Sequence, residues 1–87
     1  MERLPCYLRV TTRNGRPLAG VTFAVEQAEG PVPEIAYTTG PDGVARIGLP
    51  PGKVALRFFL ADGRQQPVSL TIRAEPDQTY DVTIDEK

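Results

Sequence analysis

The sequence predicts an all-β fold, a seven-stranded antiparallel Greek-key β-sandwich. Three observations predict it: apolar and polar residues alternate along most of the 87 residues, turn signals separate the alternating segments, and no window places apolar residues at helical spacing behind a cap. Strands with one apolar face must bury those faces together, and two sheets packed face to face do so with short connections. A closed barrel of five or six strands is the alternative.

Seven segments are expected to be strands. Five alternate clearly, over residues 6–11, 21–26, 53–60, 68–73 and 80–85, and two shorter β-prone segments lie at 35–39 and 45–49. Residues 29–34 contain Gly30, Pro31 and Pro33 and are expected to form a longer loop or an edge crossing, and a single helical turn is conceivable at 75–78. Residues 1–87 are therefore expected to form one domain with its core between residues 6 and 85.

Glycine and proline mark the turns. Asn14-Gly15, Asp42-Gly43 and Asp62-Gly63 place a residue that tolerates positive φ next to a small polar one. We expect Asp42-Gly43 to close a hairpin between the third and fourth strands. Pro50-Pro51-Gly52 excludes helix and is expected to turn the chain into the opposite sheet.

Composition excludes several classes of partner. Ten basic and eleven acidic residues give a net charge of −1, and the arginines are scattered rather than clustered with aromatic residues, which argues against nucleic acid. The apolar run at residues 58–61 is far shorter than the roughly 20 residues that span a bilayer, so no membrane insertion is expected. The N-terminus lacks an export signal, which predicts a cytoplasmic protein, or an extracellular surface domain if the chain is excised from a longer exported protein.

The inventory of reactive side chains argues against an enzyme. The chain has no histidine and one cysteine, so neither a nucleophile–histidine pair nor a zinc site can be assembled, and we assign no catalytic, cofactor-binding or metal-binding residue. Cys6 is expected to be a buried thiol. Asp42 and Asp62 each precede a glycine and are assigned to turns. The acidic face of the last segment, with Asp81 and Asp85, is interpreted as the solvated face of an edge strand.

Two aromatic residues fall out of phase with the predicted core. Tyr7 and Phe59 occupy polar positions of their strands, and Ala55 and Arg57 share the face of Phe59. An aromatic ring beside small residues and an arginine is typical of a protein-contact patch, so these four residues are the candidate site. The alternative is that a loop or the N-terminal segment covers Phe59. Tyr37 is the remaining aromatic that could face outward and offer a platform to a carbohydrate.

The order of the turn motifs resembles a known family. Residues 14–21 (NGRPLAGV), 38–45 (TTGPDGVA) and 49–52 (LPPG) follow one another as in prealbumin-like (transthyretin-like) sandwich domains with Ig-like architecture. This group includes the carboxypeptidase regulatory-like and collagen-adhesin B-type (Cna-B-like) domains. The resemblance covers about three quarters of the chain and implies a fold rather than an activity.

Two reactions known in that wider group require residues that this chain does not have. The isopeptide cross-link of B-type repeats requires a lysine near the start of the domain, where this chain has Arg9 and Arg13, and arginine is not a nucleophile. The transthyretin-like hydrolases require histidines. The expected function is a non-catalytic accessory or interaction domain, a spacer, adaptor or protein-docking module without cofactor. The alternatives are a structural module of a surface protein and a small carbohydrate-binding module.

Overall fold

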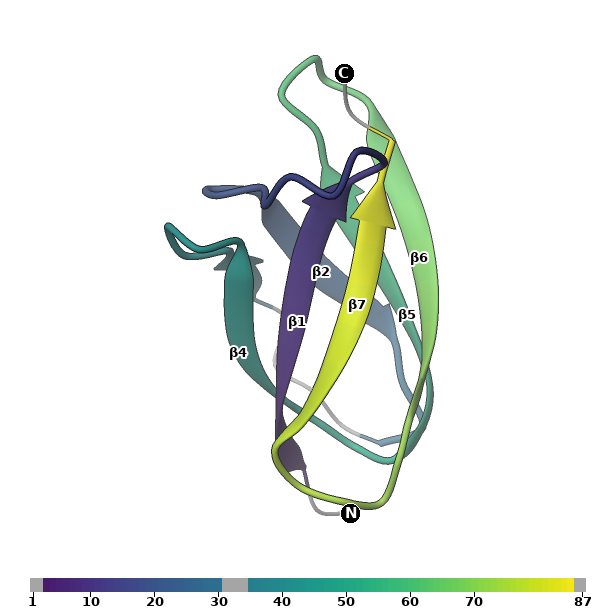
Figure 1. The fold of residues 1–87 in the computed structure, drawn as a ribbon. Coiled ribbons are helices and arrows are strands. Elements are labelled where there is room, and N and C mark those ends of the chain that lie inside the picture. Colours follow the sequence, from purple (N-terminus) through teal and green to yellow (C-terminus); the bar gives the residue numbers. More distant parts are fainter. Residues whose placement is uncertain (1–2, 31–34, 86–87) are drawn as a thin grey trace.

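The computed structural model describes residues 3–30 and 35–85, and within them every regular element is a strand (Figure 1). The predicted all-β class is confirmed. No helix among these residues is long and apolar enough to cross a membrane. The seven strands are β1 (Leu4–Thr12), β2 (Thr22–Gln27), β3 (Ala36–Thr38), β4 (Val44–Leu49), β5 (Gly52–Phe59), β6 (Gln65–Ile72) and β7 (Gln78–Ile84).

The strands form two sheets, one of three strands in the order β4-β1-β7 and one of four in the order β3-β2-β5-β6. The prediction of a wholly antiparallel arrangement is wrong at one pair, because β1 and β7 run parallel from Cys6–Gln78 to Thr12–Ile84. Each connection reverses the chain, so all odd-numbered strands run in one direction, and two odd-numbered strands that become neighbours must be parallel. Figure 1 shows β1 and β7 side by side with their arrowheads at the same end.

The turn at Asp42-Gly43 does not close a hairpin as predicted. Locally it is a tight turn, in which Gly43 N donates to Gly40 O (2.9 Å) and Val44 N to Asp42 Oδ1 (3.1 Å). However, β3 pairs with β2 in one sheet and β4 with β1 in the other, so the turn carries the chain between sheets. Residues 50–52 also cross between sheets, as predicted, from β4 to β5.

The core lies between the two sheets and matches the predicted alternation. Leu56 and Val82 are buried there, and Val68 packs against the same cluster. Phe23 stacks on Phe58 (ring centroids 4.9 Å apart) and on Tyr37 (5.5 Å). Tyr37 therefore faces the core, although the sequence left it as a candidate for the outer surface.

Cys6 is a buried thiol, as predicted. Its side chain is 1% exposed, and Sγ donates a hydrogen bond to the carbonyl oxygen of Ile47 at 3.3 Å. Desolvation raises the pKa of the thiol from 9.0 to about 11. The thiol therefore stays protonated and unreactive at neutral pH while the domain is folded.

Two further predictions concern the helical turn at residues 75–78 and the loop at residues 29–34. Residues 75–77 form a bend and turn rather than a helical turn, with Asp77 in the left-handed region at φ 60°, and β7 begins at Gln78. In the loop predicted at 29–34, residues 31–34 lie outside the described residues.

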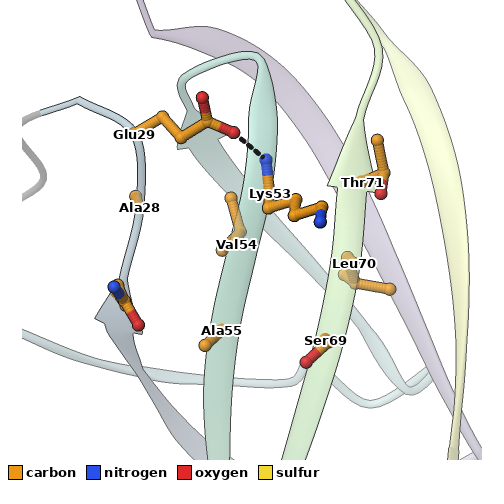
Figure 2. Close-up of a pocket in the computed structure, with 9 residues that line it drawn as sticks. Ala28, Glu29, Lys53, Val54, Ala55, Ser69, Leu70 and Thr71 are labelled. Atoms are coloured by element: carbon orange, nitrogen blue, oxygen red, sulfur yellow. Dashed lines mark hydrogen bonds between the residues drawn. The ribbon is translucent and has the colours of Figure 1, made fainter.

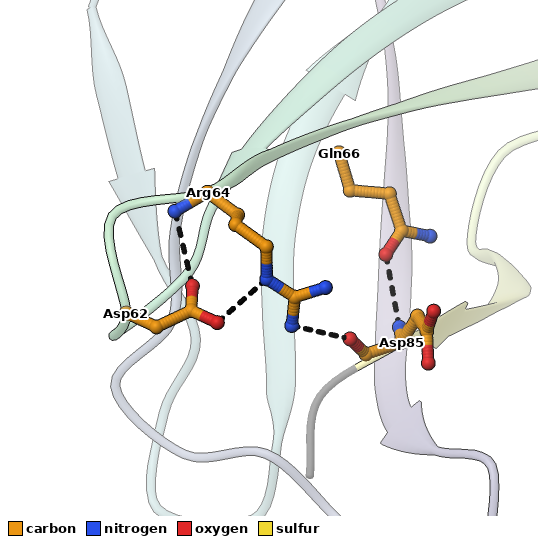
Figure 3. Close-up of polar contacts among 4 residues, drawn as sticks. All are labelled: Asp62, Arg64, Gln66 and Asp85. Carbon is orange, nitrogen blue, oxygen red and sulfur yellow. Dashed lines mark hydrogen bonds and ion pairs between the residues drawn. The ribbon is translucent and has the colours of Figure 1, made fainter.

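Side chains close the seam between the edge strands β6 and β7. Gln66 on β6 donates through Nε2 to Thr83 O (3.3 Å) and accepts at Oε1 from Asp85 N (2.9 Å), so its amide takes the place of a strand partner along β7. Arg64 donates to Asp85 O at 3.0 Å (Figure 3). At the other end of the seam, Arg73 N donates to the Tyr80 hydroxyl at 3.0 Å.

Candidate protein-contact surface

The structure separates the four predicted site residues. Ala55, Arg57 and Phe59 lie on the outer face of the four-stranded sheet, where they alternate along β5 with the buried residues of that strand. Tyr7 lies on β1 in the three-stranded sheet, and its neighbours Cys6 and Leu8 are buried. Because both sheets turn their other face to the shared core, Tyr7 faces away from the other three residues. The four residues do not form one patch.

Phe59 is exposed on its face of the sheet. The cross-strand register places it between Thr22 of β2 and Gln65 of β6, and its side chain is 39% exposed. No described segment covers the ring as the alternative interpretation supposed. The neighbouring rows of this face include the small side chains of Ala24 and Ala36.

Arg57 is held in place beside Phe59. Its Nε lies 2.8 Å from Glu26 Oε2, and its Nη1 donates to Gln65 Oε1 at 3.0 Å. These contacts reach β2 on one side and β6 on the other, so the guanidinium group lies across three strands. A side chain that is already ordered loses less conformational entropy when a partner binds.

A shallow depression continues the surface from Arg57 toward the start of β5. Its floor contains the facing pair Ala55 and Ser69, both of which are small (Figure 2). Polar side chains rise around this floor. The lining residues are Gln27, Ala28, Glu29, Lys53, Val54, Ala55, Ser69, Leu70 and Thr71.

A β-bulge opens this depression. The register between β2 and β5 shifts between Val25 and Gln27, after which β2 leaves the sheet. Glu29 then replaces the missing strand, because its carboxylate accepts a hydrogen bond from Lys53 N at 2.7 Å (Figure 2). Gly52 permits this contact, since its φ is 109° and a side chain there would collide with the Glu29 carboxylate.

Sequence reasoning missed the residues around the depression. Gln27, Glu29, Ser69 and Thr71 look like ordinary solvent-facing residues in the alternating pattern. Their association depends on the strand register and on the bulge, which local alternation does not encode. Lys53 opens the predicted strand at 53–60, and nothing in the sequence indicates which residues surround it.

The outer face of the three-stranded sheet is polar and internally paired. Arg9 Nε lies 2.6 Å from Asp81 Oδ1, and Arg13 Nε lies 3.4 Å from Asp85 Oδ1. The side-chain hydrogen bond from Arg9 lowers the pKa of the Asp81 carboxyl, and the charge of Arg9 adds to the effect. Asp81 on β7 and Asp85 just after it are thus paired with arginines on β1 and just after it.

The described residues assemble no obvious reactive centre. No group of three or more potential metal ligands lies close together among them. Asp42 and Asp62 accept hydrogen bonds from backbone amides two residues ahead, at 3.1 and 3.0 Å, as turn residues do. The core positions of β1 and β7 carry no lysine. Lys53 is exposed on β5, and Lys87 lies outside the described residues.

Comparison with known proteins supports the fold. No family model matches the chain, and no curated protein matches it in sequence. Among solved structures, it is similar to the Bacillus anthracis TIE protein (16% identity, TM-score 0.67) and to the major pilin subunit of Bacillus cereus (16% identity, TM-score 0.60). These matches cover 99% and 97% of this chain, but 16% and 30% of those proteins. The chain therefore has the fold of one part of each.

Proposed function

We propose that this chain is a non-catalytic module of a cell-surface protein that binds a protein partner through the outer face of its four-stranded sheet. The observation that carries the proposal is the exposed ring of Phe59 beside the ordered guanidinium group of Arg57. Aromatic residues and arginine contribute most of the binding energy at many protein interfaces. The depression over Ala55 and Ser69 extends the surface and offers room for a partner's side chain.

The likeness to a major pilin subunit supports the surface location and the structural role. This likeness is consistent with the resemblance of the turn motifs to the prealbumin-like group, which includes the collagen-adhesin B-type domains. The absence of histidine supports a role without catalysis. The carbohydrate alternative loses support, because Tyr37 packs on Phe23 and the aromatic rings of Tyr7 and Phe59 lie on opposite faces.

The proposal is tested by comparing variants as immobilised baits for surface proteins of the cells that make the chain. Phe59→Ala removes the ring, and Arg57→Glu reverses the charge next to it. Tyr7→Ala is the matched control, because it removes an aromatic ring from the opposite face. We expect one protein to be retained by the unmodified chain and by Tyr7→Ala, and its retention to fall at least about tenfold with either other variant.

Thermal and urea unfolding separate loss of binding from loss of folding. Phe59→Ala should cost about 1 kcal/mol or less, because the ring is 39% exposed, whereas Phe58→Ala should cost about 3–5 kcal/mol, because that ring is fully buried. The proposed surface would be contradicted if the partner were retained equally well by Phe59→Ala and Arg57→Glu. It would also be contradicted if Tyr7→Ala abolished retention to the same extent as these two variants.

A further inference from the structure

The free edge of β4 exposes unpaired backbone groups. Val10 N donates to Gly43 O at 2.9 Å, and this register directs the backbone of Ala45, Ile47 and Leu49 toward β1. The alternate residues Arg46 and Gly48 therefore direct their N–H and C=O groups away from β1. No hydrogen bond to these backbone groups occurs among the described residues.

The other edges of the two sheets are occupied, short or interrupted by proline. Gln66 occupies part of the free edge of β7 by bonding to Thr83 and Asp85. On β6, the register directs Pro67, Ser69 and Thr71 toward the free edge, and Pro67 interrupts this edge because proline has no N–H to donate there. β3 has three residues, too few for a long ladder. β4 is thus the edge strand that contains no proline and, within the described part of the chain, has unpaired outward N–H and C=O groups at two neighbouring positions, Arg46 and Gly48.

The surface beside this edge is positively charged. A shallow depression on the outer face of the sheet spans β1 and β4 and is lined by Arg3, Pro5, Arg46, Ile47 and Gly48. Gly48 keeps the depression open because it carries no side chain. Among the described residues, Arg3 and Arg46 are in no ion pair, and the same holds for Arg16 and Arg73. The remaining arginines each have a carboxylate partner, namely Arg9, Arg13, Arg57 and Arg64.

We propose that the free edge of β4 binds an extended segment of a partner protein that carries an acidic side chain. The segment adds a strand beyond β4, and its backbone pairs with Arg46 and Gly48. Its carboxylate lies between the guanidinium groups of Arg3 and Arg46, where charge-assisted hydrogen bonds are available. A second copy of this chain is a poor occupant, because a symmetric β4–β4 pair would bring the arginines of both copies together. This surface is distinct from the Phe59 surface and does not depend on it.

The test is a titration of the isotope-labelled chain with synthetic peptides, followed through backbone amide signals. The probe is a peptide of alternating threonine and valine with two central glutamates. We expect the amide signals of Arg46 and Gly48 to shift, and their hydrogen exchange to slow. Replacing the glutamates by glutamines should weaken binding about tenfold, and N-methylation along one edge of the peptide should abolish it.

Two variants of the chain make the test specific. Gly48→Pro removes an outward N–H without touching the β1 ladder, since Gly48 faces Pro5 at a non-bonded pair, and it should abolish binding. If this variant fails to fold, Arg46→Glu serves instead, and it should lose the acidic peptide and bind a lysine-containing one. The proposal is overturned by an absence of binding at millimolar peptide, by shifts confined to other strands, or by self-association through β4 in the free protein.

Discussion

Gly43 lies where three backbone segments meet. Its φ is 79°, and a Cβ added there would lie 2.9 Å from Pro17 Cβ and 3.0 Å from both Leu18 N and Val10 O. The positive φ disfavours any residue with an L side chain. The three contacts also leave no room for a Cβ, because Leu18 N and Val10 O are backbone atoms that cannot move aside. Glycine at this position is therefore needed both for the turn and for the close packing of the crossing against β1.

Gly43→Ala is predicted to destabilise the domain by about 3 kcal/mol or more, the sum of left-handed strain and overpacking. Gly15→Ala is the control, because Gly15 has nearly the same φ, 83°, but nothing within 4 Å of the added Cβ. Urea unfolding of the control should show a loss of about 1 kcal/mol. Equal losses for the two variants would show that packing at Gly43 is unimportant.

At the scale of elements, the stability contributed by the pairing of β1 with β7 depends on pH through the ion pair between Arg9 and Asp81. Arg9 lowers the pKa of the Asp81 carboxyl below its ordinary value of 3.8. The folded state therefore binds protons less readily than the unfolded state. The stabilisation is complete above the unfolded pKa and is lost as the pH falls through the folded pKa. Arg64 lowers the pKa of Asp62 in the same direction, through backbone and side-chain hydrogen bonds.

Asp81→Asn is accordingly predicted to flatten the acid limb of the stability curve. The free energy of unfolding should be steady between about pH 7 and 5 in the unmodified chain and should fall below about pH 4. The variant should fall less steeply over the same range. Both groups are well exposed, so added salt should reduce the difference between the two curves. Identical slopes at low salt would rule out this linkage.

The strands themselves were predictable because alternation with a period of two is a local signal. Each of the seven segments was found, and Leu56 and Val82 point inward as their phase required. The partners of the strands were less predictable. Asp42-Gly43 has the composition of a hairpin turn, yet it joins different sheets, because local turn chemistry fixes a reversal of direction and not the sheet that the next strand enters.

The candidate site was also predictable only in part, because alternation shows which face of a strand a residue occupies but not which sheet the strand joins. Phase along β5 correctly placed Ala55, Arg57 and Phe59 on one outer face. It could not show that Tyr7, which has the same phase on another strand, belongs to the opposite sheet. The depression beside Ala55 was also hidden, because it results from a bulge and from a pairing between strands.

At the scale of the whole molecule, we expect the parallel β1–β7 pair to determine how the domain resists tension applied to the chain ends. The two strands share seven aligned positions, and each carries one end of the chain. Tension applied to the chain ends therefore loads this ladder in shear, so that several hydrogen bonds resist together. Tension applied across the open end of the β5–β6 hairpin, between Gly52 and Ile72, instead separates one pair at a time.

Single-molecule pulling should show this difference. We predict a clearly higher unfolding force when the handles are attached at the chain ends than when they are attached at residues 52 and 72. The same domain and loading rate serve for both geometries, so global stability is held constant. Equal forces would argue against a load-bearing role for the β1–β7 ladder.

The central claim is that the domain acts through the outer face of its four-stranded sheet. Site-specific photo-crosslinking in the producing cells tests it most directly, with the photoreactive amino acid benzoylphenylalanine placed at position 59 in one variant and at position 7 in another. The account predicts a discrete protein adduct from position 59 that disappears when Arg57→Glu is added, and none of that mass from position 7. An adduct formed from position 7 alone, or equally from both faces, would contradict it.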